Sequence, residues 1–191
     1  MASWGSSDTD EAKPKWLTAE QQRSVYATSA GWVQPAAAGS GDPEVLVAIR
    51  GLSTRTSTAG DVTGLNIADV SSINWNISTF DKSDGGTLSV TVNYNEEVDV
   101  TGTPQLTVVN DSRADHTLSY ASGTGTNRLT FTLPIAAGHS SLQATDVISI
   151  GANAIAQNGG STIKDTVSTN NAVITNAAGI GTTAGSITAV A

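Results

Sequence analysis

The sequence of 191 residues contains no cysteine. Disulfide bonds, thiolate metal sites and a cysteine nucleophile are therefore excluded, and a disulfide-stabilised secreted domain is disfavoured. Aromatic residues make up only 5% of the chain and charged residues only 14%. No apolar run approaches the roughly 20 residues of a membrane-spanning helix, so we expect no membrane association. The first residues lack the basic and apolar regions of a signal peptide, which favours assembly in a cytoplasm.

The charge of the chain is acidic, with a formal net charge of −8. Most of this excess lies in residues 67–191, which carry a net charge of −6. Binding of nucleic acid needs clustered Lys and Arg side chains that replace the counterions of phosphates. The composition therefore argues against a nucleic-acid partner.

Apolar residues alternate with polar ones from about Ile67 onwards, as the segments 88–94 and 129–133 illustrate. A period of two is typical of β-strands with one buried face. Short turn sequences rich in Gly, Asp, Asn and Pro separate about seven such strands, as expected for an antiparallel sandwich. We therefore predict a mainly β protein with a sandwich over residues 67–176. Residues 177–191 are predicted to be a flexible tail or an additional strand that pairs with a neighbour.

Residues 1–66 have a different pattern, with little apolar periodicity and several linkers rich in Ala, Gly and Ser. Thr18 and Gln21 form the two ends of a capping box, which predicts a short helix from about Ala19 to Tyr26. Such a helix is too short to persist alone, because isolated helices below about 12–15 residues are marginal in water. A nearly continuous apolar run over residues 43–52 predicts a strand. We interpret this segment as an extended N-terminal docking arm.

Three of the four tryptophans fall within this arm, where a globular core is least expected. Large aromatic rings outside a core need a surface to cover them, and burial of one ring removes about 150–250 Å² from water. We therefore predict a partner-binding set that comprises Trp4, Lys15, Trp16, Leu17, Tyr26, Trp32, Val33, Val45, Val47, Ile49 and Arg50. The alternative is that the rings fold back and complete the core of the sandwich. We favour docking, because flexible linkers separate the rings from the sandwich.

Residues 68–176 resemble the bacterial and phage Ig-like modules, especially the repeat type of large surface proteins of marine bacteria. The similarity is carried by the segments 88–94, 98–108, 120–131 and 162–165. The sequence departs from that family before Leu88, where Asp84-Gly85-Gly86 replaces an aromatic residue and a Gly-Asp pair. This resemblance implies an Ig-like β-sandwich that serves display or adhesion and has no enzymatic activity.

The arm is similar to the leaders of virion structural proteins from large contractile-tailed phages, through the segments 13–17, 25–28, 31–33 and 44–52. This resemblance implies a virion component, most simply a head decoration or cement protein on the capsid surface. Its expected partners are the major capsid protein and other virion subunits, with homo-oligomers possible on the particle. The alternatives are a tail, neck, baseplate or fibre component, or a module that binds a host glycan.

Residues suited to catalysis or metal binding are few. His116 and His139 lie far apart in sequence in polar contexts, and we interpret both as exposed loop histidines. The segment 81–86 is interpreted as an Asp-Gly turn, because it lacks the distal Glu of a calcium loop. Glu96, Glu97, Asp99, Asp111 and Asp115 are interpreted as a solvated acidic rim, with a calcium site as the less favoured alternative. We expect no enzyme, no cofactor and no metal.

Overall fold

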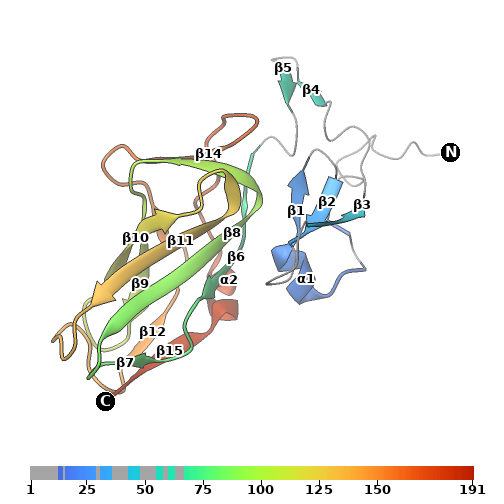
Figure 1. The fold of residues 1–191 in the computed structure, drawn as a ribbon. Helices are drawn as coiled ribbons and strands as arrows, with labels where there is room; N and C mark the ends of the chain where they lie inside the picture. The colour runs from blue at the N-terminus through green and yellow to red at the C-terminus, as the bar shows by residue number, and fades with distance from the viewer. Residues whose placement is uncertain are drawn as a thin grey trace.

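The computed structural model describes residues 13–14, 16–28, 31–35, 43–47, 55–57, 60–62 and 67–191. Within these residues the chain is mainly β, with 15 strands and two short helices (Figure 1). The strands form a ten-stranded main sheet, a separate three-stranded sheet and a two-stranded hairpin. The prediction of a mainly β protein is therefore confirmed.

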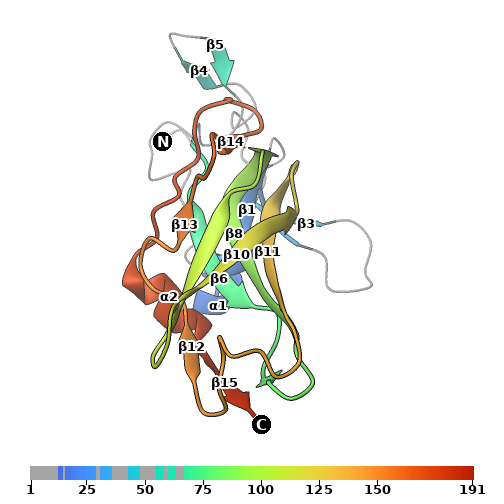
Figure 2. The same cartoon turned by 90° about the vertical axis from the view of Figure 1, so that its left-hand side faces the viewer.

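The main sheet curls on itself like a half-barrel (Figures 1 and 2). It contains β6 (Val70–Trp75), β7 (Phe80–Asp81), β8 (Gly86–Thr101), β9 (Gln105–Asn110), β10 (His116–Ser122), β11 (Thr126–Ile135), β12 (Val147–Ser149), β13 (Ile155–Ala156), β14 (Thr162–Asp165) and β15 (Ser186–Val190). The strand order is β14-β8-β11-β10-β9-β12-β15-β7, with β6 paired to β8 and β13 paired to β9. All these pairs are antiparallel except β15 with β7.

The concave side of the main sheet holds the core. Leu88, Val90 and Val92 of β8 and Leu129 and Phe131 of β11 are completely buried. Their alternation with less buried neighbours confirms the predicted period of two, because successive side chains of a strand point to opposite faces. The turn between β7 and β8 is also as predicted: the Asp81 carboxylate accepts hydrogen bonds from the amides of residues 83 and 84.

The C-terminal residues belong to the main sheet rather than to a separate tail. Helix α2 (Ala178–Ala184) packs against β6, and β15 inserts between β12 and β7. The indole of Trp75 donates a hydrogen bond to the carbonyl of Gly185 at 3.3 Å. Of the two alternatives predicted for residues 177–191, the flexible tail is wrong, because Ile187 and Ala189 are buried in the core. The additional strand is present as β15, which pairs within the main sheet.

The N-terminal region is folded where the structure describes it. Helix α1 (Ala19–Ser24) is followed by a sheet of β1 (Tyr26–Thr28), β2 (Gly31–Gln34) and β3 (Glu44–Val47), in which both pairs are antiparallel. We call the described residues between 13 and 47 the N-terminal unit. The capping box is confirmed: the Thr18 hydroxyl accepts from the amide of Gln21, whose side chain bonds back to the Thr18 amide.

The N-terminal unit lies beside β6 and β8, against which β1 and α1 pack (Figures 1 and 2). The prediction of an extended arm is therefore wrong for these residues, since they form local structure and contact the main sheet. Within the predicted linker over residues 53–66, β4 (Arg55–Ser57) and β5 (Gly60–Val62) form an antiparallel hairpin.

Candidate functional site

The N-terminal unit has a small core of its own. Leu17, Val25, Ala27 and Trp32 form a buried cluster, with Leu46 packed against it. The Trp32 side chain is only 2% exposed, and the neighbouring Val33 is equally inaccessible at 3%. For Leu17, Trp32 and Val33 the expectation that a partner must cover the side chain is therefore wrong. The pairing of β2 with β1 on one side and β3 on the other assembles an apolar cluster that the sequence pattern did not indicate.

Two members of the predicted partner-binding set do face solvent. The Trp16 side chain is 67% exposed and that of Val45 is 46% exposed. Val45 lies on β3, the outermost strand of the three-stranded sheet. Val47 also lies on β3, at the register position of Trp32. The other predicted residues, Trp4, Lys15, Ile49 and Arg50, lie outside the described residues.

Tyr26, the remaining member of the set, is half-buried where β1 meets the main sheet. Burial raises the pKa of the Tyr26 phenol, and the carboxylate of Glu97 raises it further, whereas Arg128 lowers it. These two charged residues belong to β8 and β11. Tyr26 therefore belongs to the junction between the N-terminal unit and the main sheet, and not to a freely exposed docking surface.

A groove with a volume of about 580 Å³ lies at this junction. Residues from α1 and β2 line one side of it, and residues from β6, β8 and β11 line the other. All eleven lining residues that the structure describes are polar, and none of them is aromatic. A groove of this size falls within the range of roughly 300–1,000 Å³ that is usual for small-molecule sites, but those sites are mostly apolar. The polar lining therefore indicates a polar ligand.

The floor of the groove is ordered by hydrogen bonds between β6 and β8. The Ser72 hydroxyl accepts from the carboxamides of Asn74 at 3.3 Å and Asn93 at 2.9 Å. Next to it, the Asn76 carboxamide donates to the Ser89 hydroxyl at 2.8 Å, and its oxygen accepts from the Thr91 hydroxyl at 2.9 Å. These side chains hold one another in fixed positions before any ligand arrives.

The sequence reasoning missed this floor, although its signal was present. Ser72 and Asn74 of β6, and Asn76 directly after it, are the polar members of an alternating pattern that predicts a strand with one buried face. The pattern does not indicate that residues of α1 and β2 lie opposite this face and line the groove with it. The two cations of the groove, Arg23 and Arg128, are likewise brought together only by the tertiary fold.

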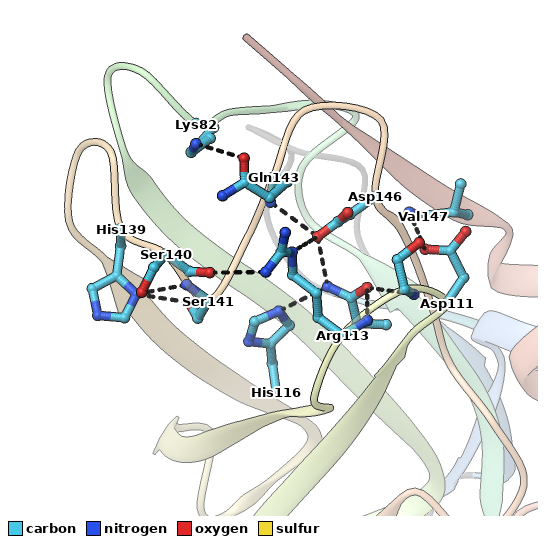
Figure 3. A network of polar contacts seen from close by, with 12 residues as sticks. Lys82, Asp111, Arg113, His116, His139, Ser140, Ser141, Gln143, Asp146 and Val147 are labelled. Atoms are coloured by element: carbon cyan, nitrogen blue, oxygen red, sulfur yellow. Dashed lines mark hydrogen bonds and ion pairs between the residues drawn. The ribbon is translucent and has the colours of Figure 1, made fainter.

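A second polar cluster surrounds Asp146, which directly precedes β12 and lies against the β9–β10 connection (Figure 3). One carboxylate oxygen of Asp146 accepts from the Gln143 amide at 2.9 Å and from the Asn110 carboxamide at 3.2 Å, and it lies 3.3 Å from the Arg113 guanidinium. His116 lies 3.4 Å from the same carboxamide. Burial alone would raise the pKa of Asp146, but these hydrogen bonds and the charge of Arg113 outweigh it and lower the pKa.

His116 is 5% exposed, so the interpretation as an exposed loop histidine is wrong for this residue. Burial lowers the pKa of His116, the carboxylates of Asp115 and Asp146 act in the opposite direction, and His139 lowers the pKa further. His139 is exposed as predicted, and its Nδ1 atom lies 2.8 Å from the Ser141 hydroxyl. The Ser141 amide also donates to this nitrogen, so the pair makes a local turn and not an oriented nucleophile with a base.

The acidic residues considered for calcium are separated by the sheet register. Val98 pairs with Thr126 at the start of β11, which places Glu97 and Asp99 at that end of the sheet. Asp111 and Asp115 lie in the connection from β9 to β10, at the opposite end. Among the described residues there is no group of three or more His, Asp or Glu side chains that could hold a metal ion. The calcium alternative is therefore wrong for this set.

Comparison of the chain with known proteins gave no match to any protein-family model and no match to any curated protein. None of the helices that the structure describes is long and apolar enough to cross a membrane. Two surfaces of the described residues therefore point to function, namely the exposed part of the N-terminal unit and the polar groove.

Proposed function

We propose that this protein is a non-enzymatic structural component of a virion, namely a head decoration or cement protein. In this proposal the N-terminal unit docks on the major capsid protein, and the main sheet is displayed outward on the capsid surface as an Ig-like β-sandwich. The resemblances of the two segments to virion leaders and to Ig-like modules support this assignment. The observation that carries it is the exposure of Trp16, which is 67% accessible in a chain with very few aromatic residues.

The exposed part of this indole can supply binding energy when a partner covers it. An aromatic side chain buries about 150–250 Å², so covering the accessible two-thirds of Trp16 would contribute about 3 kcal/mol at roughly 25 cal/mol per Å². That energy corresponds to about a hundredfold in affinity. Large aromatic side chains at the centre of an interface are the usual binding hot spots. Trp16 is thus the best single anchor among the described residues of the N-terminal unit.

The outer edge of β3 offers a second contact. β3 is the last strand of its sheet, and no described strand pairs with its outer side. An unpaired edge presents backbone amides and carbonyls that can bind an additional strand of a partner. The exposed Val45 side chain lies on this strand. Docking by strand addition would fix the orientation of the unit, while Trp16 would supply much of the affinity.

The test is cosedimentation of the purified protein with heads assembled from the major capsid protein of the same genome. We expect the native chain to cosediment, and Trp16→Ala to weaken binding by roughly a hundredfold. Val45→Glu should also weaken binding, because it introduces a charge at the edge of β3. The matched control is Val167→Ala, because Val167 is equally exposed at 50% but belongs to the main-sheet part of the chain.

Binding that is unaffected by both N-terminal substitutions would contradict docking through this unit. Absence of any cosedimentation of the native chain would contradict the capsid assignment itself. A protein that assembles into rings without capsids would instead favour the tail, neck or baseplate alternative.

A module that binds a glycan is the second candidate function, and one observation favours it. The described residues that line the groove beside the N-terminal unit are all polar and are rich in carboxamide and hydroxyl groups. Such groups both donate and accept hydrogen bonds, as the hydroxyls of a sugar require.

A further inference from the structure

The groove between α1 and the outer face of β6, β8 and β11 combines ordered hydrogen-bonding groups with two cations. Arg23 contributes one guanidinium from α1, and Arg128 contributes the other from β11. Among the described lining residues, Glu20 is the only acid. The groove therefore has a net positive charge, although the chain as a whole carries a net charge of −8. This local reversal of charge indicates an anionic ligand.

Both guanidinium groups have N–H donors that make no hydrogen bond with the described residues. Arg23 uses its Nε atom to donate to the Ala19 carbonyl at 3.3 Å, which leaves its terminal nitrogens without a hydrogen bond to the described residues. The Arg128 guanidinium is exposed and makes no hydrogen bond or ion pair with the described part of the chain. Paired donors of an Arg side chain match the two oxygens of a carboxylate or a sulfate.

The remaining lining groups restrict the ligand further. Asn74 and Asn93 are anchored through Ser72, so their carboxamides lie in fixed positions on the floor. Gln34 contributes a carboxamide from β2 on the opposite wall, and its side chain has no hydrogen bond among the described residues. An apolar ligand would leave these donors and acceptors unpaired, which is energetically unfavourable. The ligand must therefore carry hydroxyl groups over most of its surface.

We propose that this groove binds an acidic saccharide. Arg23 and Arg128 hold its carboxylate or sulfate group, and the carboxamides of the floor and walls bind its hydroxyls. A simple inorganic anion is too small to occupy about 580 Å³. Nucleic acid is disfavoured because its phosphates require more cations than this acidic chain presents. The groove is formed jointly by the N-terminal unit and the main sheet, so the proposal does not depend on the virion assignment.

The experiment is isothermal titration of the full chain with three oligosaccharides of equal length: a polyuronate, a sulfated glycan and a neutral glucan. We expect binding of at least one acidic oligosaccharide and weaker or absent binding of the neutral one. The two acidic arms distinguish a carboxylate from a sulfate as the recognised group. Side-chain amide signals of Asn74, Asn93 and Gln34 should shift in nuclear magnetic resonance spectra during the titration.

Substitutions separate a specific groove from general attraction to charge. Arg128→Gln and Arg23→Gln should each weaken binding by about tenfold or more, as expected for a lost charge-assisted hydrogen bond. Lys164→Gln makes a similar change of charge at an exposed residue of β14 outside the groove, and it should leave affinity nearly unchanged. Glu20→Gln removes the acid found among the described lining residues and should tighten binding.

Three results would overturn the proposal. The first is binding of none of the acidic oligosaccharides, and the second is equal binding of the neutral one. The third is an equal loss of affinity in Lys164→Gln and Arg128→Gln, which would show attraction to charge without a site. Inorganic sulfate should not compete at concentrations similar to those of the acidic saccharide. The result of the cosedimentation experiment with capsids does not change how these saccharide-binding results are interpreted.

Discussion

The ammonium group of Lys13 lies 2.9 Å from the hydroxyl oxygen of Ser71, and this hydrogen bond joins the N-terminal unit to β6. The same ammonium donates to the Gln22 carbonyl at 2.9 Å and lies 5.8 Å from the ring centroid of Trp32. Burial lowers the pKa of Lys13, and the carboxylate of Asp69 acts in the opposite direction. One partly buried cation thus connects the core of the N-terminal unit, α1 and the main sheet.

We expect Lys13→Met to loosen the N-terminal unit from the main sheet. The substitution keeps an apolar stem but removes two charge-assisted hydrogen bonds and the cation–π contact, which together stabilise by about 1–3 kcal/mol. Hydrogen exchange should become faster in residues 16–28 and stay unchanged in β9 and β10. Lys82→Met is the control, because Lys82 bonds Gln143 away from this junction. Wild-type exchange in Lys13→Met would contradict the role of Lys13 as a link.

The two tryptophans of the N-terminal unit should differ in emission wavelength and in quenching by acrylamide in the isolated protein. Trp32 is 2% exposed and Trp16 is 67% exposed. Trp32→Phe should therefore remove emission at short wavelength that resists quenching by acrylamide, whereas Trp16→Phe should remove emission at long wavelength that is readily quenched. Fluorescence of the purified chain, with no other component added, measures both. Loss of the protected emission in Trp16→Phe and not in Trp32→Phe would contradict the small core.

Truncation of the buried Trp32 side chain to alanine should destabilise the N-terminal unit. Trp32→Ala should reduce the stability of the N-terminal unit by about 3–5 kcal/mol, as for other large aromatic residues in cores. Because this cluster is separate from the core of the main sheet, β8 to β11 should keep most of their protection from hydrogen exchange. Equal loss of protection in both regions would show that the two cores unfold as one.

Alanine substitutions at two glycines of α2 distinguish the effect of helix propensity from the effect of tertiary packing. A methyl group at Gly181 would collide with the carbonyl oxygen of Ile150, whereas Gly179 has open space around it. Helix propensity alone predicts that alanine stabilises both positions by up to about 1 kcal/mol. We expect Gly179→Ala to raise the thermal midpoint and Gly181→Ala to lower it. Stabilisation by Gly181→Ala would show that α2 does not pack closely against residue 150.

Features fixed by local rules could be predicted from the sequence. The alternation of Leu88, Val90 and Val92 identified the buried face of β8, because side-chain direction in a strand depends only on position. The capping box of Thr18 and Gln21 identified the start of α1 for a similar reason, since its hydrogen bonds span three residues. Neither inference required knowledge of the rest of the fold.

Features that depend on contacts between distant segments could not be predicted in this way. Trp32 is covered because β3 pairs with β2 and because Leu17 and Val25, on either side of α1, pack in the same cluster. The polar linkers of the sequence did not indicate this pairing. The groove exists because α1 stands over the polar face of β6. His116 is buried because Asp146 and Asn110, 36 positions apart, meet beside it. In each case the sequence shows the residue type, but it does not show which distant segment packs against that residue.

The burial of His116 predicts a loss of stability in mild acid. Burial lowers the pKa of this imidazole below the ordinary value of 6.5, despite the nearby carboxylates of Asp115 and Asp146. The unfolded chain therefore binds a proton more readily than the folded chain when the pH lies between the folded pKa and 6.5. The free energy of unfolding should fall as the pH is lowered through this window, because protonation favours the unfolded state.

Urea unfolding midpoints between pH 8 and pH 4.5 measure this effect. In His116→Gln the midpoint should vary much less below pH 6.5, because glutamine cannot take up a proton but can still bond the Asn110 carboxamide. His139→Gln is the control, since His139 is exposed and its main contact is a local turn. Asp146, whose pKa is lowered in the folded state, should contribute a further loss only as the pH falls below about 3.8. A pH dependence that persists in His116→Gln and disappears in His139→Gln would contradict the assignment of this effect to His116.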